Sequence, residues 1–131
     1  MRLVLDASAA VLTVLSPGQA RRFASALENA DEVLAPELLV AEVTNTIWKY
    51  HQFERLSVDV CDRSLELALE LVDRFVPGRE LHREAFLLAR TTRRSAYDMF
   101  YLALARREDA LLLTGDAALR REAEHQGIRL G

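Results

Sequence analysis

The sequence has few of the residues that mark disulfide scaffolds, zinc sites and disordered chains. Its 131 residues include one cysteine, three histidines, five glycines and three prolines. Cys61 has no partner for an internal disulfide, and its helical segment predicts a small residue in or beside the core. The three histidines, His51, His82 and His125, do not have the spacing of zinc ligands. With 50% hydrophobic residues, the chain is expected to fold rather than to be disordered.

Hydrophobic runs long enough to span a bilayer are also absent, because all of them are well below about 20 residues. The acidic Asp6 interrupts the apolar start of the chain before a signal-peptide segment can form. We therefore expect a cytoplasmic protein without a membrane partner. The length predicts a single domain over residues 1–131. The net charge of -3 argues against a nonspecific nucleic-acid coat protein, but it leaves room for a nuclease.

Short apolar segments alternate with helical patterns along the chain. This alternation predicts an α/β protein whose central parallel sheet of about four to five short strands is flanked by helices. Pro36 is expected in the first turn of a helix. We expect strands at residues 2–5, 33–35, 111–114 and 128–130, and helices at residues 9–15, 19–29, 37–53, 57–75, 79–93, 97–107 and 117–125.

Two aspartates follow predicted strands directly. Asp6 ends the first strand, and Asp116 ends the third with one glycine between. Ligands of parallel sheets bind beyond the carboxyl ends of the strands, where both side chains are expected. Each has a hydroxyl residue two positions away, Ser8 or Thr114, to hold the carboxylate or a metal-bound water. Either aspartate alone is equally well explained as a helix N-cap.

Asp98 is the strongest single signal in the sequence. It is the only charged residue between Ala96 and Ala105, in a helix whose apolar residues cover every direction. Burying an ionised carboxylate there is costly unless a positive group pairs with it. Its place in the first turn offsets part of that cost through the helix dipole, so a structural aspartate is the alternative to a metal ligand.

Glu42 lies at the edge of a predicted core face. Leu39, Val43 and Ile47 share that face of the helix, and Asn45 follows Glu42 by one turn. Asn45 is placed to orient the carboxylate by hydrogen bonding. Taken alone, Glu42 reads more simply as an ordinary boundary residue.

Clustered carboxylates with no histidine or cysteine nearby suit Mg²⁺ or Mn²⁺ rather than zinc. Without a cation such a cluster would repel itself and raise its own pKa values. Carboxylates around hard cations are typical of enzymes that cleave phosphodiesters with a metal-activated water. The residues therefore indicate a Mg²⁺- or Mn²⁺-dependent phosphoryl-transfer enzyme.

Four segments together carry a resemblance that covers essentially the whole chain. In their order and spacing, the chain resembles PIN-domain ribonucleases, and more narrowly the VapC-like toxins of VapBC toxin–antitoxin pairs. The segments are Leu3 to Ser8, Pro36 to Asn45, Tyr97 to Ala105 and Leu112 to Asp116.

The resemblance implies a PIN-like fold and endonucleolytic cleavage of RNA by metal-activated water. It also implies a homodimer and a cognate VapB-like antitoxin whose tail enters the acidic groove. Asp6, Glu42, Asp98 and Asp116 match the acidic quartet that holds one or two Mg²⁺ or Mn²⁺ ions in the family. The supporting polar positions of the family match Ser8, Asn45 and Thr114.

RNA contacts are predicted at the basic end of the helix over residues 79–93. Arginines gather on one side of this segment, and Arg93 and Arg94 lead directly into the segment of Asp98. Arginines at this place are suited to bind phosphate. A solvated helix face, a dimer contact or an antitoxin contact is the alternative interpretation.

Two other functions stay open at this point. One is a PIN-type nuclease that processes RNA outside a toxin–antitoxin system. The other is a non-catalytic module that binds RNA or a protein and uses its acidic groove only for an arginine of the partner. A phosphoaspartate enzyme fits less well, because the segment from Asp6 to Ser8 lacks a second acid.

Overall fold

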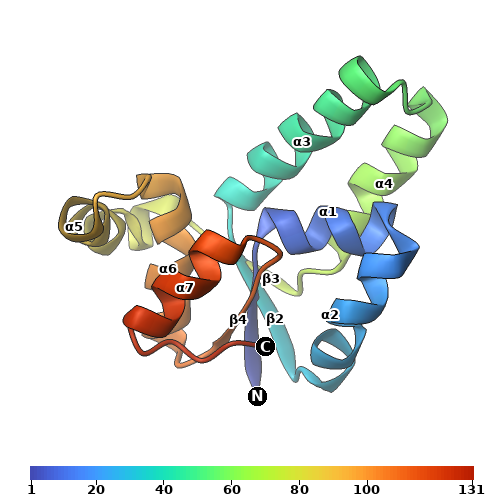
Figure 1. The fold of residues 1–131 in the computed structure, drawn as a ribbon. Coiled ribbons are helices and arrows are strands. Elements are labelled where there is room, and N and C mark those ends of the chain that lie inside the picture. The colour runs from blue at the N-terminus through green and yellow to red at the C-terminus, as the bar shows by residue number, and fades with distance from the viewer.

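The computed structural model describes residues 1–131 as seven α-helices, one short 3-10 helix and four strands (Figure 1). In chain order these are β1 (Arg2–Leu5), α1 (Ala7–Leu15), α2 (Pro17–Asn29), β2 (Glu32–Pro36), α3 (Leu38–Glu54), α4 (Val58–Glu70), β3 (Arg74–Val76), η1 (Gly78–Glu80), α5 (His82–Thr92), α6 (Ala96–Glu108), β4 (Leu111–Leu113) and α7 (Ala117–His125).

The four strands form one parallel sheet in the order β3-β2-β1-β4. Leu3 of β1 pairs with Val33 of β2 on one side and with Leu111 of β4 on the other. Leu3, Val4 and Leu5 have no exposed surface, as expected for a central strand that is covered on both faces. The predicted α/β fold with a parallel, helix-flanked sheet is confirmed.

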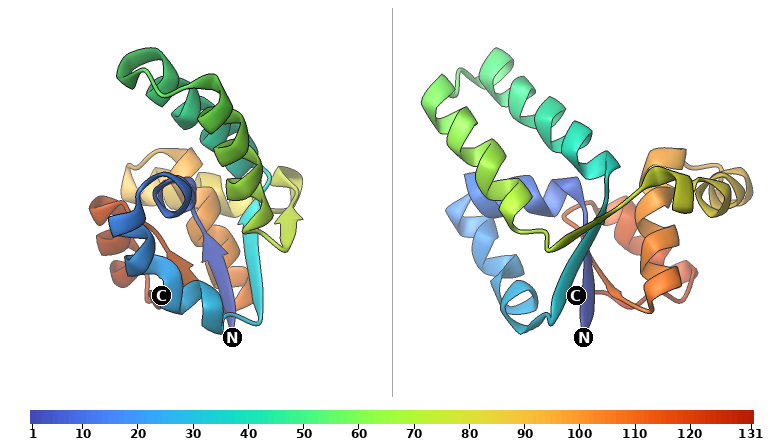
Figure 2. Two further views of the ribbon diagram at one scale, coloured as in Figure 1. Left: turned by 90° about the vertical axis from the view of Figure 1, so that its right-hand side faces the viewer. Right: turned by 180° about the vertical axis from the view of Figure 1, so that it is seen from behind.

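Helices cover both faces of the sheet. Figure 2 shows α1, α2 and the α3–α4 pair on one side and α5, α6 and α7 on the other. The α3–α4 pair extends away from the sheet as an antiparallel hairpin, and its tip lies farthest from the two chain ends (Figure 1). Leu39, Val43 and Ile47 are buried as predicted, and Cys61 of α4 is also buried. No helix has the length and apolar character needed to cross a bilayer.

Strand β3, at the edge of the sheet, was not predicted. The helix expected over residues 57–75 ends at Glu70, and Arg74–Val76 pairs with the end of β2. Three residues are too few to show the alternating pattern of a strand. No glycine or proline lies between α4 and β3 to mark the end of the helix. The carboxylate of Asp73 fixes the strand entry, since it accepts a hydrogen bond of 2.7 Å from the backbone N–H of Val33.

Three further expectations are corrected. Pro36 ends β2 opposite Val76 instead of starting α3. The helix predicted over residues 79–93 is divided, because a 3-10 turn ends at Glu80 and α5 begins at His82. The strand predicted at residues 128–130 is reduced to a single bridge between Leu112 and Leu130.

Candidate active site

The carboxyl ends of β1 and β4 place two aspartates side by side. Asp6 follows β1 and caps α1, with its carboxylate accepting from the backbone N–H of Ala9 at 2.9 Å. Asp116 follows β4 and caps α7, accepting from Ala118 at 2.8 Å and Leu119 at 3.3 Å. Since β1 and β4 are neighbours in the sheet, the two N-caps lie at one edge. Both aspartates therefore have the capping role, and it places them where ligands bind.

Hydroxyl groups hold Asp6 in a fixed orientation. Ser8 Oγ donates to Asp6 Oδ1 at 2.8 Å, and the Thr114 hydroxyl donates to Asp6 Oδ2. Ser8 Oγ accepts from the N–H of Gly115 at 2.9 Å, and Thr114 Oγ1 accepts from the N–H of Asp116 at 3.0 Å. These bonds tie the ends of β1 and β4 together around one carboxylate that is only 5% exposed.

Glu42 of α3 is held by a tyrosine from the opposite side of the sheet. Tyr101 OH donates to Glu42 Oε1 at 2.7 Å. Tyr101 lies on α6 and its side chain is almost completely buried, whereas Glu42 is half-buried. Only one Glu42 oxygen is engaged, so the other remains available to a ligand.

Asp98 lies half-buried in the first turn of α6. Unlike the other three acids, its carboxylate accepts no hydrogen bond and makes no ion pair with a protein group. The nearby Arg94 guanidinium lowers the pKa of Asp98, but burial and the negative charge of Asp116 outweigh it and leave that pKa raised. A half-buried carboxylate without a direct partner is costly unless a further cation binds it.

The four acids line one pocket of about 230 Å³. They come from four separate parts of the chain: the ends of β1 and β4, the second turn of α3 and the first turn of α6. The complete lining consists of Asp6, Ala7, Ser8, Glu42, Thr46, Asp98, Tyr101 and Asp116.

Burial in this pocket weakens the acidity of its carboxyl groups. It raises the pKa of Asp6 to about 6, against the lowering effect of its hydrogen bonds to Thr114, Ala9 and Ser8. Burial also raises the pKa of Glu42, with a smaller contribution from the charge of Asp98. The pocket thus carries negative charge that a cation would stabilise.

The donor set fits Mg²⁺ or Mn²⁺. All candidate ligands are carboxylate oxygens. Glu42, Asp98 and Asp116 each keep at least one oxygen without a protein donor, whereas both oxygens of Asp6 accept hydrogen bonds from the protein and keep only their remaining lone pairs for a cation. As they stand, no three side chains of His, Cys, Asp or Glu converge on one point. Mg²⁺ does not require such convergence, because it usually keeps several waters and binds through one or two carboxylates and the phosphate of a substrate.

Most of the predicted site residues meet in this pocket. The quartet and Ser8 line it, and Thr114 joins it through Asp6. Asn45 lies outside it and does not bond Glu42; Tyr101 makes that hydrogen bond instead. Arg93 is exposed and makes no ion pair, whereas Arg94 bonds Glu122 at 3.0 Å.

Sequence reasoning did not identify Tyr101 or Thr46. Tyr101 follows Asp98 by three residues and therefore lies on the same side of α6. Thr46 follows Glu42 by four residues on α3. A hydroxyl group three or four residues after a candidate acid could have indicated both residues. In the sequence analysis, however, Tyr101 was counted among the apolar residues of its helix.

Comparisons with known proteins identify the family of the chain. The PIN domain family matches residues 3–124. The chain is 31% identical over 125 residues to ribonuclease VapC3 of Pyrobaculum aerophilum. The alignment covers 91% of this chain and 92% of that protein. It is 30% identical over 117 residues to ribonuclease VapC9 of Mycobacterium tuberculosis, covering 89% and 87% of the two chains.

Solved structures show the same fold at lower identity. PAE2754 from Pyrobaculum aerophilum has a TM-score of 0.73 at 20% identity, covering 92% of this chain and 86% of that one. VapBC2 from Rickettsia felis, bound to a DNA fragment from their promoter, has a TM-score of 0.67 at 14% identity, covering 100% and 98%. VapC20 of Mycobacterium tuberculosis, described as a toxin that cleaves the sarcin-ricin loop, has a TM-score of 0.66 at 17% identity, covering 92% and 94%.

The chain therefore belongs to the PIN domain family. Its curated relatives are VapC ribonucleases that align over most of both chains, so it is an enzyme of the VapC ribonuclease type.

Proposed function

We propose that this chain is the toxin of a toxin–antitoxin pair and cleaves RNA endonucleolytically with Mg²⁺ or Mn²⁺ bound by Asp6, Glu42, Asp98 and Asp116. The observation that carries the proposal is the single pocket lined by these four carboxylates, from four parts of the chain. Burial raises the pKa of three of them, which is unfavourable for the chain alone and favourable once a cation binds.

Each acid has a different degree of constraint. Asp6 is the rigid member, because both of its oxygens accept hydrogen bonds from the protein. Glu42 is held through one oxygen, and Asp116 through one oxygen at the start of α7. Asp98 is free to move toward a ligand. A bound Mg²⁺ or Mn²⁺ supplies Lewis-acid stabilisation of phosphate charge and activation of water.

Arginines close to Asp98 are the proposed contacts for the RNA backbone. Arg93 ends α5 in a left-handed conformation, with its side chain exposed and without an ion pair. Arg94 is partly engaged by Glu122, yet its charge reaches Asp98. Arg93 is thus the freer phosphate ligand, and Arg94 balances the negative charge at the mouth of the site.

Partners are proposed from the exposed apolar side chains. Apart from Met1 and Tyr97, the large hydrophobic residues that are exposed all lie on α3, α4 or α5. Such surfaces commonly mark protein contacts. We assign them to a second copy of the chain in a homodimer and to a VapB-like antitoxin, in keeping with the Rickettsia felis relative. A short open reading frame for a DNA-binding protein next to this gene would support the antitoxin.

Removing divalent cations should abolish RNA cleavage, and adding them back should restore it. Purified protein with EDTA is expected to leave total RNA intact, because the carboxylates alone repel the phosphate. Excess Mg²⁺ or Mn²⁺ should then yield fragments with discrete mapped ends. The rate with metal should exceed the rate in EDTA by about a hundredfold or more.

Two results would contradict the metal-dependent ribonuclease. One is cleavage that continues unchanged in EDTA, and the other is RNA that remains intact with either cation. Titration of Mn²⁺ against thermal stability in the absence of RNA provides an independent control, since a bound cation must stabilise the folded chain.

Replacing Tyr101 with phenylalanine should weaken Mn²⁺ binding by about tenfold or more. The change keeps the buried ring and removes only the hydroxyl that orients Glu42. The free energy of unfolding should fall by about 1 kcal/mol, typical of one lost hydrogen bond. Mn²⁺ affinity can be measured by electron paramagnetic resonance of the free ion.

Tyr50→Phe is the matched control for this change. Tyr50 is a partly buried tyrosine of α3 whose hydroxyl makes no hydrogen bond and lies outside the acidic pocket. Equal Mn²⁺ affinity in Tyr101→Phe and the wild type would show that the hydroxyl does not position Glu42.

A further inference from the structure

A second pocket of about 410 Å³ adjoins the carboxylate pocket. Glu42 lines both, so the two pockets meet at this side chain. Its volume is within the range of about 300–1,000 Å³ that is typical of sites for organic ligands. The lining consists of Leu38, Ala41, Glu42, Asn45 and Tyr97, and we call it the Tyr97 pocket.

Tyr97 presents an aromatic ring beside the site. Its side chain is 63% exposed, although the neighbouring Met99 and Tyr101 of the same helix are buried. The backbone is fixed at the start of α6, where the N–H of Tyr97 donates to Ser95 Oγ at 3.2 Å. Because Asp98 is the next residue, the ring is anchored one position from a candidate metal ligand. An exposed ring on a rigid support is suited to stack a nucleic-acid base.

Asn45 adds a polar group to the same pocket. It follows Glu42 by almost one turn of α3, its side chain is exposed, and its amide makes no hydrogen bond within the protein. An amide offers both a donor and an acceptor, which matches the edge of a nucleobase. Leu38 and Ala41 complete an apolar wall on the same helix.

We propose that the Tyr97 pocket binds one unstacked nucleobase of the RNA, adjacent to the phosphate at the carboxylates. Tyr97 stacks on the base, and Asn45 bonds its edge. Proteins that read RNA sequence commonly bind single-stranded bases in this way. The proposal rests on the ribonuclease function given above and assigns a base preference to that same site.

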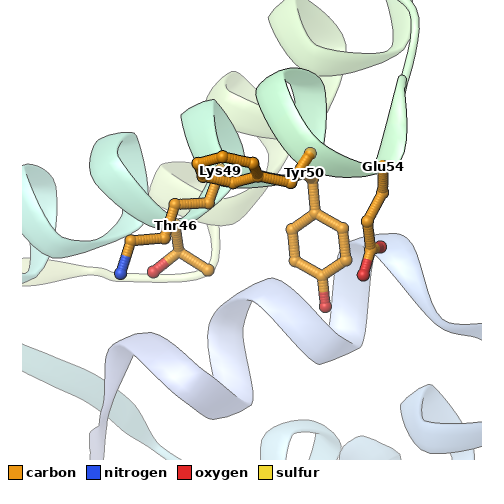
Figure 3. Close-up of a pocket in the computed structure, with 5 residues that line it drawn as sticks. Thr46, Lys49, Tyr50 and Glu54 are labelled. Carbon is orange, nitrogen blue, oxygen red and sulfur yellow. The ribbon is translucent and has the colours of Figure 1, made fainter.

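A pocket along α3, which shares Thr46 with the acidic pocket, suits a base less well. Figure 3 shows Tyr50 and Glu54 projecting from α3 toward α1, with Lys49 directed to the Thr46 side. Tyr50 is less exposed than Tyr97, so its ring offers less surface for stacking. The carboxylate of Glu54 would repel the RNA backbone. The Tyr97 pocket therefore offers the better stacking surface.

The test compares Tyr97→Leu with the wild type on a short RNA that contains one mapped cleavage site. Loss of base stacking should reduce kcat/KM by about ten- to a hundredfold, mainly through KM. Tyr97→Trp should retain cleavage, because the indole also stacks. Mn²⁺ affinity should stay within about twofold of the wild type, since the Asp98 carboxylate is unchanged. Asn45→Ala should make cleavage less selective for the base beside the scissile phosphate.

Binding is followed separately with 2-aminopurine placed at successive positions of the same RNA. In an Asp116→Asn background that does not cleave, stacking on Tyr97 should quench the fluorescence at one position beside the scissile phosphate. Adding Tyr97→Leu should abolish that quenching.

Phe86→Leu is the control for association between copies. Phe86 lies on α5, is 62% exposed and does not line either pocket, so it matches Tyr97 in exposure. If both leucine variants lower cleavage equally and dissociate a dimer in size-exclusion chromatography, Tyr97 is a subunit contact and the proposal is wrong. Unchanged kcat/KM in Tyr97→Leu also overturns it. Failure of the wild type to cleave RNA with metal would instead refute the ribonuclease function.

Discussion

Asp98→Asn is expected to reduce metal-dependent RNA cleavage by about a hundredfold or more without unfolding the protein. The carboxylate accepts no hydrogen bond and makes no ion pair, so its function is not to bond another protein group. Asparagine keeps the size of the side chain and removes the charge that a cation would bind. Mn²⁺ affinity should fall together with the rate of cleavage, and both can be measured on the same preparation.

Stability should change in the opposite direction to activity. Burial and the charge of Asp116 raise the pKa of Asp98, which means that the ionised form is disfavoured in the folded chain without metal. A neutral asparagine relieves that cost, so thermal unfolding without metal should occur at an equal or higher temperature than in the wild type. A purely structural aspartate would give the reverse: lower stability and little change in Mn²⁺ affinity.

Asp59→Asn provides the matched control for Asp98→Asn. Asp59 lies in the first turn of α4, as Asp98 lies in the first turn of α6, but it is exposed and remote from the acidic pocket. Both substitutions remove the same interaction with a helix dipole, worth about 0.3–1 kcal/mol. Cleavage should be lost only in Asp98→Asn. Retained cleavage in Asp98→Asn would exclude Asp98 from the active site.

The fold was largely predictable because its strands and helices carry clear patterns. The central strand from Leu3 to Leu5 is wholly apolar and ends at an acid, so both its burial and its edge follow from the sequence. The short β3 could not be predicted in the same way. Its residues continue the hydrophobic pattern of α4. Only the pairing of Arg74–Val76 with β2 in the folded chain shows that this segment is a strand and not the end of the helix.

The site was less predictable, because its geometry depends on contacts between distant segments. Asp98 could be identified from its apolar surroundings, and Asp6 from its place after a strand. Glu42 joined them through the family resemblance, since helical periodicity places it at an ordinary boundary. The bond from Tyr101 to Glu42 joins residues on opposite sides of the sheet, and no local pattern encodes it. The predicted partner of Glu42, Asn45, instead lines the neighbouring pocket.

Stabilisation of the protein by Mn²⁺ is expected to be large near pH 7.5 and small near pH 5. Burial raises the pKa of Asp6 in the folded chain to about 6, whereas its ordinary value is 3.8. A cation binds the ionised carboxylate, so protons compete with it below pH 6. The ionised fraction of Asp6 falls from about nine tenths at pH 7 to about one tenth at pH 5, which lowers the Mn²⁺ affinity about tenfold. The raised pKa values of Glu42 and Asp98 add to this loss.

The apo protein should show the opposite dependence on pH. Because the folded chain binds the Asp6 proton more tightly than the unfolded chain does, this group favours folding below pH 3.8 and loses that contribution as the pH rises through 6. The shift of about two pKa units corresponds to about 3 kcal/mol. Thermal unfolding at pH 5, 6 and 7.5, with and without Mn²⁺, separates the two effects. Asp6→Asn should reduce both the apo trend and the pH dependence of the Mn²⁺ shift, leaving only the parts that come from Glu42 and Asp98. An Mn²⁺ shift of equal size across this range would show that no carboxyl of raised pKa binds the ion, and it would therefore exclude Asp6 as a ligand.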